Sequence, residues 1–270
     1  MLLQRVITAL VLAPLAIGLL FLAEAELFAL GLMPLILVGG AEWCRLAGVK
    51  SVAFKTIYIL LLGLLMLICY QWPVVVGPLL VLTPIWWLLI GWVITGYPGK
   101  QPRWLLSKAP MLLAGPLLLV VSWYAFIVMR GRPDGQWLIM LLFALVWGAD
   151  IGAYFAGRRW GKVKLMPEVS PGKSWEGVVG GSVAALVIAA IAAVSSGQTG
   201  IELVYLIVVG MVTAWVSVVG DLAESLFKRR AGVKDSGKLL PGHGGVLDRI
   251  DGLVVAAPFF SVAMLGHWQF

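Results

Sequence analysis

Nine stretches of mostly apolar residues follow one another along this chain, and each is close to the length that a bilayer-crossing helix requires. A helix needs about 20 predominantly apolar residues to span the hydrocarbon core. The stretches cover roughly 6–22, 27–44, 54–70, 73–95, 109–129, 137–157, 175–196, 201–226 and 247–268. The sequence therefore predicts an all-α integral membrane protein, a polytopic bundle of about nine transmembrane helices.

The composition agrees, because 61% of the 270 residues are hydrophobic and only 12% are charged. Soluble domains are typically about 25% charged. Two points stay open along the chain. Prolines at 78, 84, 110 and 116 leave the ends of the fourth and fifth helices undecided. The first stretch could instead be a signal peptide, because Ala23-Glu24-Ala25 resembles a cleavage site.

The basic residues predict the orientation of the bundle. With the N-terminus in the cytoplasm, 18 of the 20 Lys and Arg residues fall on inner segments, and only Arg130 and Arg132 fall on outer loops. Lys and Arg accumulate on the cytoplasmic loops of membrane proteins. This bias explains the net charge of +7 without a nucleic-acid partner, and we expect none.

Two inner segments, 150–176 and 221–251, hold more polar residues than the rest of the chain. Residues 225–251 alone contain nine charged residues, one His and five Gly. Asp150, Asp221 and Glu224 lie inside or at the ends of apolar stretches, where a carboxylate costs about 2.5–3.5 kcal/mol at mid-membrane. Such residues indicate function, although Glu224 could also simply reach the water at the headgroups.

Helical spacing predicts a metal site among these carboxylates. Asp221, Glu224, Ser225 and Lys228 share one helix face, because they are three, four and seven residues apart. If the last two helices pack together, Asp221 and Asp248 can converge at the inner mouth of the bundle. Carboxylate oxygens there suit a hard cation such as Mg²⁺. We expect Asp221 and Asp248 to bind it, with Asp150 and Asp251 as further candidate ligands, and leave one or two cations open.

Basic residues and glycines around these carboxylates predict an anion site. Backbone N–H groups in glycine turns bind anions together with Lys and Arg, and a helix start at Ser170-Pro171 would offer more. His243 would donate a hydrogen bond to phosphate. Positive-inside bias explains the number of bases, but not why they are interleaved with Asp and Gly. The expected anion-binding residues are Ser170, Lys173, Ser225, Lys228, Arg229, Lys234, His243, Gly244, Gly245 and Arg249.

The absence of an obvious nucleophile narrows the chemistry. No Ser-His-acid or Cys-His combination is apparent, and the sequence contains only two His residues. A phosphate monoester, with a second pKa near 6, is mostly dianionic at neutral pH and needs no base before it attacks. Cations that align and neutralise two phosphates would suffice. The residues therefore indicate metal-assisted transfer between a lipid phosphate and a soluble phosphate compound at the cytoplasmic mouth.

The same residues resemble the signature of a known family. Ser225, Lys228-Arg229, Lys234-Asp235, Gly237, Leu240-Pro241, His243-Gly244-Gly245, Asp248-Arg249 and Asp251 are similar, in type and spacing, to the CDP-diacylglycerol synthases, or phosphatidate cytidylyltransferases. Asp150, Tyr154, Gly157, Gly161-Lys162 and the run from Ser170 to Gly177 also resemble that family. The first half of the chain resembles it only in length and hydropathy.

This resemblance implies an enzyme that converts CTP and phosphatidate into CDP-diacylglycerol and pyrophosphate with Mg²⁺. It implies a homodimer in the bacterial inner membrane, with Asp221 and Asp248 as metal ligands and Asp221, Asp248, Lys228, Lys234 and Asp251 as catalytic residues. We expect one membrane-embedded domain over 1–270, with a scaffold at roughly 1–130 and a catalytic half at 137–268. The alternatives are a CTP-dependent kinase of a polyprenol-type lipid and an anion transporter.

Overall fold

Helices make up nearly the whole structure. The computed structural model describes residues 10, 14–99, 104, 106–240, 242 and 244–265. Residues 14–22 are helical. The labelled helices are α2 (Ala25–Leu46), α3 (Val52–Gln71), α4 (Pro73–Thr95), α5 (Lys108–Arg130), α6 (Gly135–Trp160), α7 (Trp175–Ser195), α8 (Gly200–Ala231) and α9 (Leu247–Met264). The predicted helical bundle is thus confirmed for the described residues.

Seven of these helices, α2 to α8, are long and apolar enough to cross a membrane. Helix α9 has 18 residues and carries Asp248, Arg249 and Asp251 in its first turns, so it does not meet the same criterion. The first predicted stretch, 6–22, lies partly outside the described residues. The integral membrane character follows from the seven helices, while nine spans and a cytoplasmic N-terminus stay predictions.

The prolines in the fourth and fifth helices do not interrupt them. Helix α4 begins at Pro73 and continues through Pro78 and Pro84, and α5 continues through Pro116. Proline is favourable at the first position of a helix, where no N–H partner is lost. Helix α8 ends at Ala231. The next residue, Gly232, has a φ of 66°, a left-handed conformation that glycine adopts without strain. Of the two helices whose ends the sequence left open, α4 begins at a proline, and α4 and α5 are each followed by a glycine, Gly96 and Gly131.

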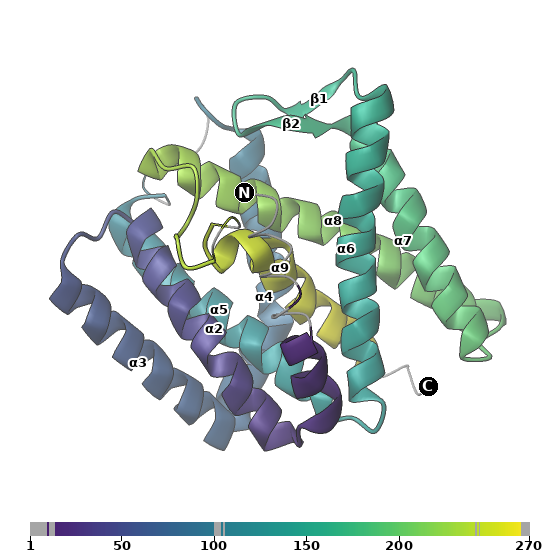
Figure 1. Ribbon diagram of the computed structural model, residues 1–270, viewed down its shortest axis with the longest axis horizontal. Coiled ribbons are helices and arrows are strands. Elements are labelled where there is room, and N and C mark those ends of the chain that lie inside the picture. The colour runs from purple at the N-terminus through teal and green to yellow at the C-terminus, as the bar shows by residue number, and fades with distance from the viewer. Residues whose placement is uncertain are drawn as a thin grey trace.

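A small β-hairpin corrects the purely helical prediction. Strands β1 (Lys164–Met166) and β2 (Ser170–Ser174) pair antiparallel, and the hairpin lies at the top of Figure 1. The predicted helix start at Ser170-Pro171 is wrong, because α7 begins at Trp175. Ser174 caps that helix by accepting a hydrogen bond of 3.1 Å from the N–H of Gly177. Pro171 fits an edge strand, where its missing N–H is tolerated.

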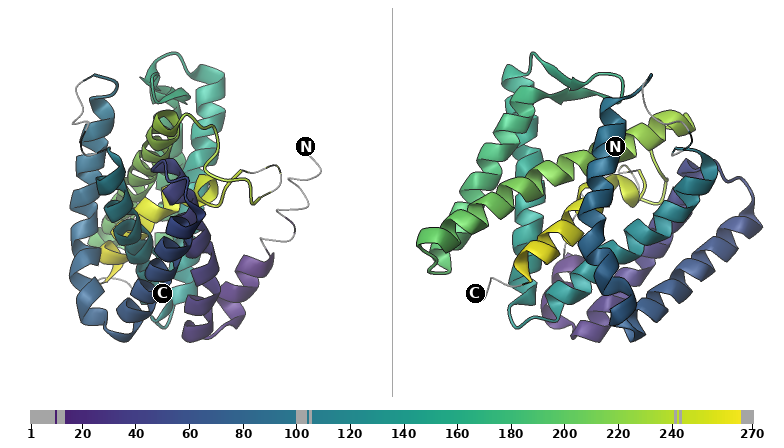
Figure 2. Two further views of the ribbon diagram at one scale, coloured as in Figure 1. Left: turned by 90° about the vertical axis from the view of Figure 1, so that its left-hand side faces the viewer. Right: turned by 180° about the vertical axis from the view of Figure 1, so that it is seen from behind.

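Helix α9 lies in the middle of the bundle. It contacts α2, α4, α5, α6 and α8, and most of its residues from Gly252 onward are buried. Figure 1 and Figure 2 show α6 and α7 side by side, with α8 crossing the bundle and contacting both α7 and α9. The segments that carry the predicted site, from α6, the hairpin, α8 and α9, are thereby brought together.

Helices α6 and α7 approach closely because small residues line their contact. A Cβ atom added at Gly180 of α7 would overlap the Cβ of Ala156 and lie 2.8 Å from the carbonyl oxygen of Gly152. Small residues let backbones of membrane helices come this near. The contact supports the wall of the site described below.

We expect Gly180→Ala to lower the stability of the protein in detergent by about 1–3 kcal/mol, because an extra methyl group in a filled contact forces the helices apart. Gly77→Ala in α4 is the matched control, since its Cβ would meet nothing within 4 Å. Thermal unfolding of both variants measures the difference. Equal unfolding temperatures would contradict the close α6–α7 contact.

Candidate active site

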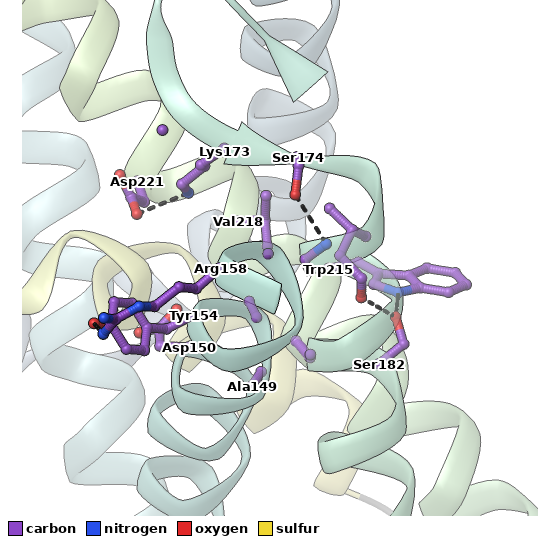
Figure 3. Close-up of a pocket in the computed structure, with 17 residues that line it drawn as sticks. Ala149, Asp150, Tyr154, Arg158, Lys173, Ser174, Ser182, Trp215, Val218 and Asp221 are labelled. Atoms are coloured by element: carbon purple, nitrogen blue, oxygen red, sulfur yellow. Dashed lines mark hydrogen bonds and ion pairs between the residues drawn. The ribbon is translucent and has the colours of Figure 1, made fainter. Parts of the chain in front are cut away.

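An ion pair between α8 and the hairpin forms the first part of the candidate site. The Lys173 ammonium lies 2.7 Å from Oδ2 of Asp221 (Figure 3). On the other side, the Ser225 hydroxyl donates to Oδ1 of Asp221 at 3.4 Å. Asp221 and Ser225 therefore share a helix face, as predicted from their spacing. In the structure, Lys173 of strand β2 pairs with the same carboxylate.

A cavity of about 420 Å³ adjoins this ion pair. Its walls come from α6, β2, α7 and α8, and its polar residues include Asp150, Arg158, Lys173 and Asp221. Figure 3 shows Lys173 and Asp221 near the hairpin, and Asp150 and Arg158 lower in the view, beside Tyr154. The remaining wall is largely apolar, formed by Ala149, Ala153, Val178, Ala214 and Val218. Such a cavity suits a molecule with an anionic part and an apolar part.

The residues around this cavity hold one another in place. The Arg158 guanidinium donates to the Tyr154 hydroxyl at 3.0 Å, and the Trp215 indole donates to the Ser182 hydroxyl at 2.8 Å. The Arg229 guanidinium donates to the carbonyl of Val169, at 3.3 Å. Arg229 and Lys173 thus both fasten the hairpin to α8. Neither contact was foreseen, because the hairpin itself was not predicted.

A second cluster lies where α8 meets α9. The Lys228 ammonium is 2.6 Å from Oε2 of Glu224 and 2.8 Å from Oδ1 of Asp248. The two carboxylate side chains are only 6% exposed, and Lys228 is 17% exposed. Glu224 therefore lies in the protein rather than in headgroup water. Removing a charge from water is costly unless a partner is present, so Lys228 is required by both carboxylates.

Asp248 also organises the loop that precedes α9. Its Oδ2 accepts hydrogen bonds from the Ser236 N–H and hydroxyl, both at 2.9 Å, and from the Gly245 N–H at 2.8 Å. The Gly244 N–H donates to the carbonyl of Leu240 at 3.1 Å. The Gly244 and Gly245 N–H groups, which we expected to bind phosphate, thus already donate hydrogen bonds within the protein. Gly244 and Gly245 would need a local rearrangement to offer them to a substrate.

The other predicted residues are placed as follows. Asp251 interacts electrostatically with Asp221, Lys173 and Lys228, so charged residues of both clusters lie near it. Ser170 belongs to β2, and Lys234 and Arg249 have exposed side chains. His243 lies outside the described residues. Lys234 forms no ion pair within the described part of the chain, which leaves its ammonium accessible to an anionic substrate.

The carboxylates are compatible with a hard cation, although the structure does not form a complete metal centre. No three His, Cys, Asp or Glu side chains converge as a metal-binding group among the residues described. Asp221 and Asp150 repel each other across the cavity, and Lys173 is the positive group that now offsets them. Oxygen ligands of this kind suit Mg²⁺. Asp248 contacts Lys228 rather than Asp221, so a shared ion between the two aspartates stays a prediction.

Glu42, Arg45 and Ser236 belong to the site region, but the sequence analysis did not identify them. Glu42 and Arg45 lie in α2 and contact the loop before α9. The signal for Glu42 was present, because it is a carboxylate inside the apolar stretch 27–44. A carboxylate at this position is as costly in a membrane as Asp150 or Asp221. Ser236 carries no such signal, since serine is common in loops.

These features define a class: an integral membrane protein with a charged, phosphate-compatible site where apolar helices end. Residues 3–266 match the model of the Cytidylyltransferase family. The chain belongs to this family.

Relatives over nearly the whole length agree with this assignment. The chain is 43% identical to the phosphatidate cytidylyltransferase of Pseudomonas aeruginosa, with 98% of this chain and 97% of the relative covered. It is 39% identical to the enzyme of that name from Haemophilus influenzae, covering 97% and 98%. It is 38% identical to that of Brucella suis, covering 94% and 89%. The predicted family is confirmed.

We expect Lys228→Met to lower the unfolding temperature clearly, because Glu224 and Asp248 would lose the cation that they share. Breaking a buried ion pair costs about 3–5 kcal/mol, and less where water reaches it. Arg230→Met is the control, since Arg230 is exposed on the same helix end. Thermal unfolding in detergent tests this, and similar losses in both variants would mean that Lys228 is not the shared partner.

Proposed function

We propose that this chain is a nucleotidyltransferase that moves the cytidylyl group of CTP to phosphatidate, forming CDP-diacylglycerol and pyrophosphate in phospholipid synthesis. The family and the names of the relatives support this activity. The structural observation that carries it is the cavity beside the Lys173–Asp221 pair, where charged and apolar walls meet. Phosphatidate has both a phosphate and acyl chains, and such a cavity suits both parts.

The reaction requires alignment and charge neutralisation more than proton transfer. An oxygen of the phosphatidate phosphate forms a bond to the α-phosphorus of CTP. The bond from that phosphorus to the leaving oxygen breaks, and its electron pair departs with pyrophosphate. Because the phosphate monoester is already ionised near neutral pH, no general base is needed. Lys173 and Arg158 in the cavity wall would reduce the repulsion between the two anions.

Mg²⁺ is part of this proposal. Asp221 would bind it, with Asp150 and Asp251 as nearby carboxylates and Asp248 as the further predicted ligand. The ion would neutralise phosphate oxygens and the departing pyrophosphate. Lys173 would then be released from Asp221 and be free to contact phosphate. A second cation remains compatible with the number of carboxylates.

The orientation is proposed from charge. Placing the basic inner segments in the cytoplasm puts the hairpin and the loop before α9 on that side. We therefore propose a bacterial inner-membrane enzyme whose site faces the cytoplasm, where it meets soluble CTP, and whose lipid substrate enters from the membrane. A homodimer and the division into scaffold and catalytic halves stay part of the proposal.

The direct test is incubation of the purified protein with phosphatidate and CTP labelled at either the α or the γ phosphate. We expect the α label in the lipid product and the γ label in pyrophosphate. Entry of the γ label into a lipid would indicate a kinase instead. If neither label entered lipid, with folded protein and Mg²⁺ present, the proposal would be contradicted.

We expect Asp221→Asn and Asp248→Asn each to lower kcat by at least about 100-fold while the protein stays folded, because each removes a charge that the phosphates or their cations require. Initial rates and thermal unfolding, measured on the same preparations, test this. A near-normal rate for either variant would show that its carboxylate is not part of the catalytic machinery.

Lys234→Ala should raise the KM for CTP or lower kcat by about tenfold or more, because an exposed lysine beside the site would lose its contact with phosphate. Lys50→Ala is the matched control, since Lys50 is an exposed lysine in the turn between α2 and α3 and serves only orientation. Steady-state kinetics of both variants separate the two roles. Equal effects would contradict the distinction between site bases and orientation bases.

A further inference from the structure

Glu42 of α2 is a buried carboxylate that holds the start of α9. Glu42 is only 7% exposed to solvent. One carboxylate oxygen accepts a hydrogen bond from the N–H of Val246 at 3.0 Å, and the other accepts from the N–H of Leu247 at 2.8 Å. The first N–H groups of a helix lack partners within the helix and attract negative charge. Glu42 therefore caps α9 from a helix about 200 residues away in sequence.

Ser236 connects Glu42 to Asp248. The Ser236 hydroxyl lies 3.1 Å from Oε2 of Glu42 and 2.9 Å from Oδ2 of Asp248, and the residue is fully buried. Arg45, one turn after Glu42, donates to the Ser236 carbonyl at 3.3 Å. Helix α2 thus contacts this serine through two side chains. Ser236 therefore couples the position of Asp248 to that of Glu42. Because Lys228 pairs with Asp248, its position depends on the same contact.

Two glycines of the loop leave room for the Glu42 carboxylate. A Cβ at Gly237 would overlap Oε1 of Glu42, and a Cβ at Gly245 would lie 2.5 Å from the same oxygen. Real side chains do not approach this closely, so any other residue at either position would displace Glu42 or the loop. The glycines and the carboxylate therefore form one packing unit.

We propose that Glu42 is a positioning residue for the cytidylyl transfer: from α2 it fixes the N-terminus of α9 and the 236–247 loop so that Asp248 and Lys228 keep their catalytic arrangement. This inference rests on the proposed function. The role is positioning rather than contact with substrate, because Glu42 is buried and does not line the cavity.

The test uses Glu42→Gln in the full-length protein. The amide keeps the shape but replaces one accepting oxygen with an NH₂ group, which would face an N–H donor of Val246 or Leu247. We expect kcat per folded molecule to fall by about 10- to 100-fold, in line with the effect of small displacements of catalytic groups. The KM values for CTP and phosphatidate should change much less. Trypsin should cut after Lys234 and Lys238 several-fold faster, because the loop is released.

Two control variants separate positioning from a loss of charge or of stability. Glu26→Gln removes a carboxylate from an exposed site on the same helix, and should leave kcat and the cleavage rate unchanged. Ser122→Ala removes a buried hydroxyl that contacts the Leu118 and Val254 carbonyls and ties α5 to α9. It should lower the unfolding temperature without lowering kcat well below that temperature.

A Glu42→Gln protein with wild-type kcat and wild-type tryptic cleavage would overturn the inference. It would also be overturned if the loss of activity only followed the loss of stability, as for Ser122→Ala. Failure of the proposed function is a separate outcome, in which the wild-type protein itself makes no CDP-diacylglycerol. In that case, unchanged tryptic cleavage of Glu42→Gln would also remove the structural basis of the inference.

Discussion

The structure depends on how buried carboxylates are compensated where the apolar helices meet the polar segments. Glu42, Glu224 and Asp248 are largely withdrawn from water, and each must meet a cation or N–H donors there. Lys228 forms ion pairs with Glu224 and Asp248. Backbone N–H groups of the loop and of the start of α9 donate hydrogen bonds to Asp248 and Glu42. These contacts join α2, α8 and α9, so the buried charges determine how these helices are connected.

The glycines of the loop before α9 have a structural role that the sequence alone does not reveal. Its glycines indicate open backbone N–H groups for phosphate, yet the N–H of Gly245 is bound to Asp248 and that of Gly244 to Leu240. Gly237 and Gly245 are required at least as much by the nearby Glu42 carboxylate. The signature shared with the family thus specifies the internal packing of a loop as well as contacts to substrate.

The cavity and the buried cluster suggest two different tasks for neighbouring charges. Asp150, Lys173 and Asp221 line an accessible cavity with an apolar wall, whereas Lys228, Glu224 and Asp248 lie in the protein and hold α8 to α9. Asp251 interacts with charges of both groups. Such an arrangement suits a reaction that depends on aligning two anions, because the buried contacts hold the helices while the charges at the cavity can meet the substrates.

The sequence by itself determined the membrane class, the positions of most helices and the family, and it indicated the segments that carry the candidate site. These properties are local: hydropathy needs about 20 residues, and the signature lies within a short segment. Only the tertiary structure decided that Lys173 pairs with Asp221, that Lys228 joins Glu224 to Asp248, and that Glu42 caps α9. The β-hairpin, too, emerged only there, since three- and five-residue strands leave little pattern. Contacts between helices distant in sequence depend on how those helices pack, and hydropathy carries no information about which side chains then meet.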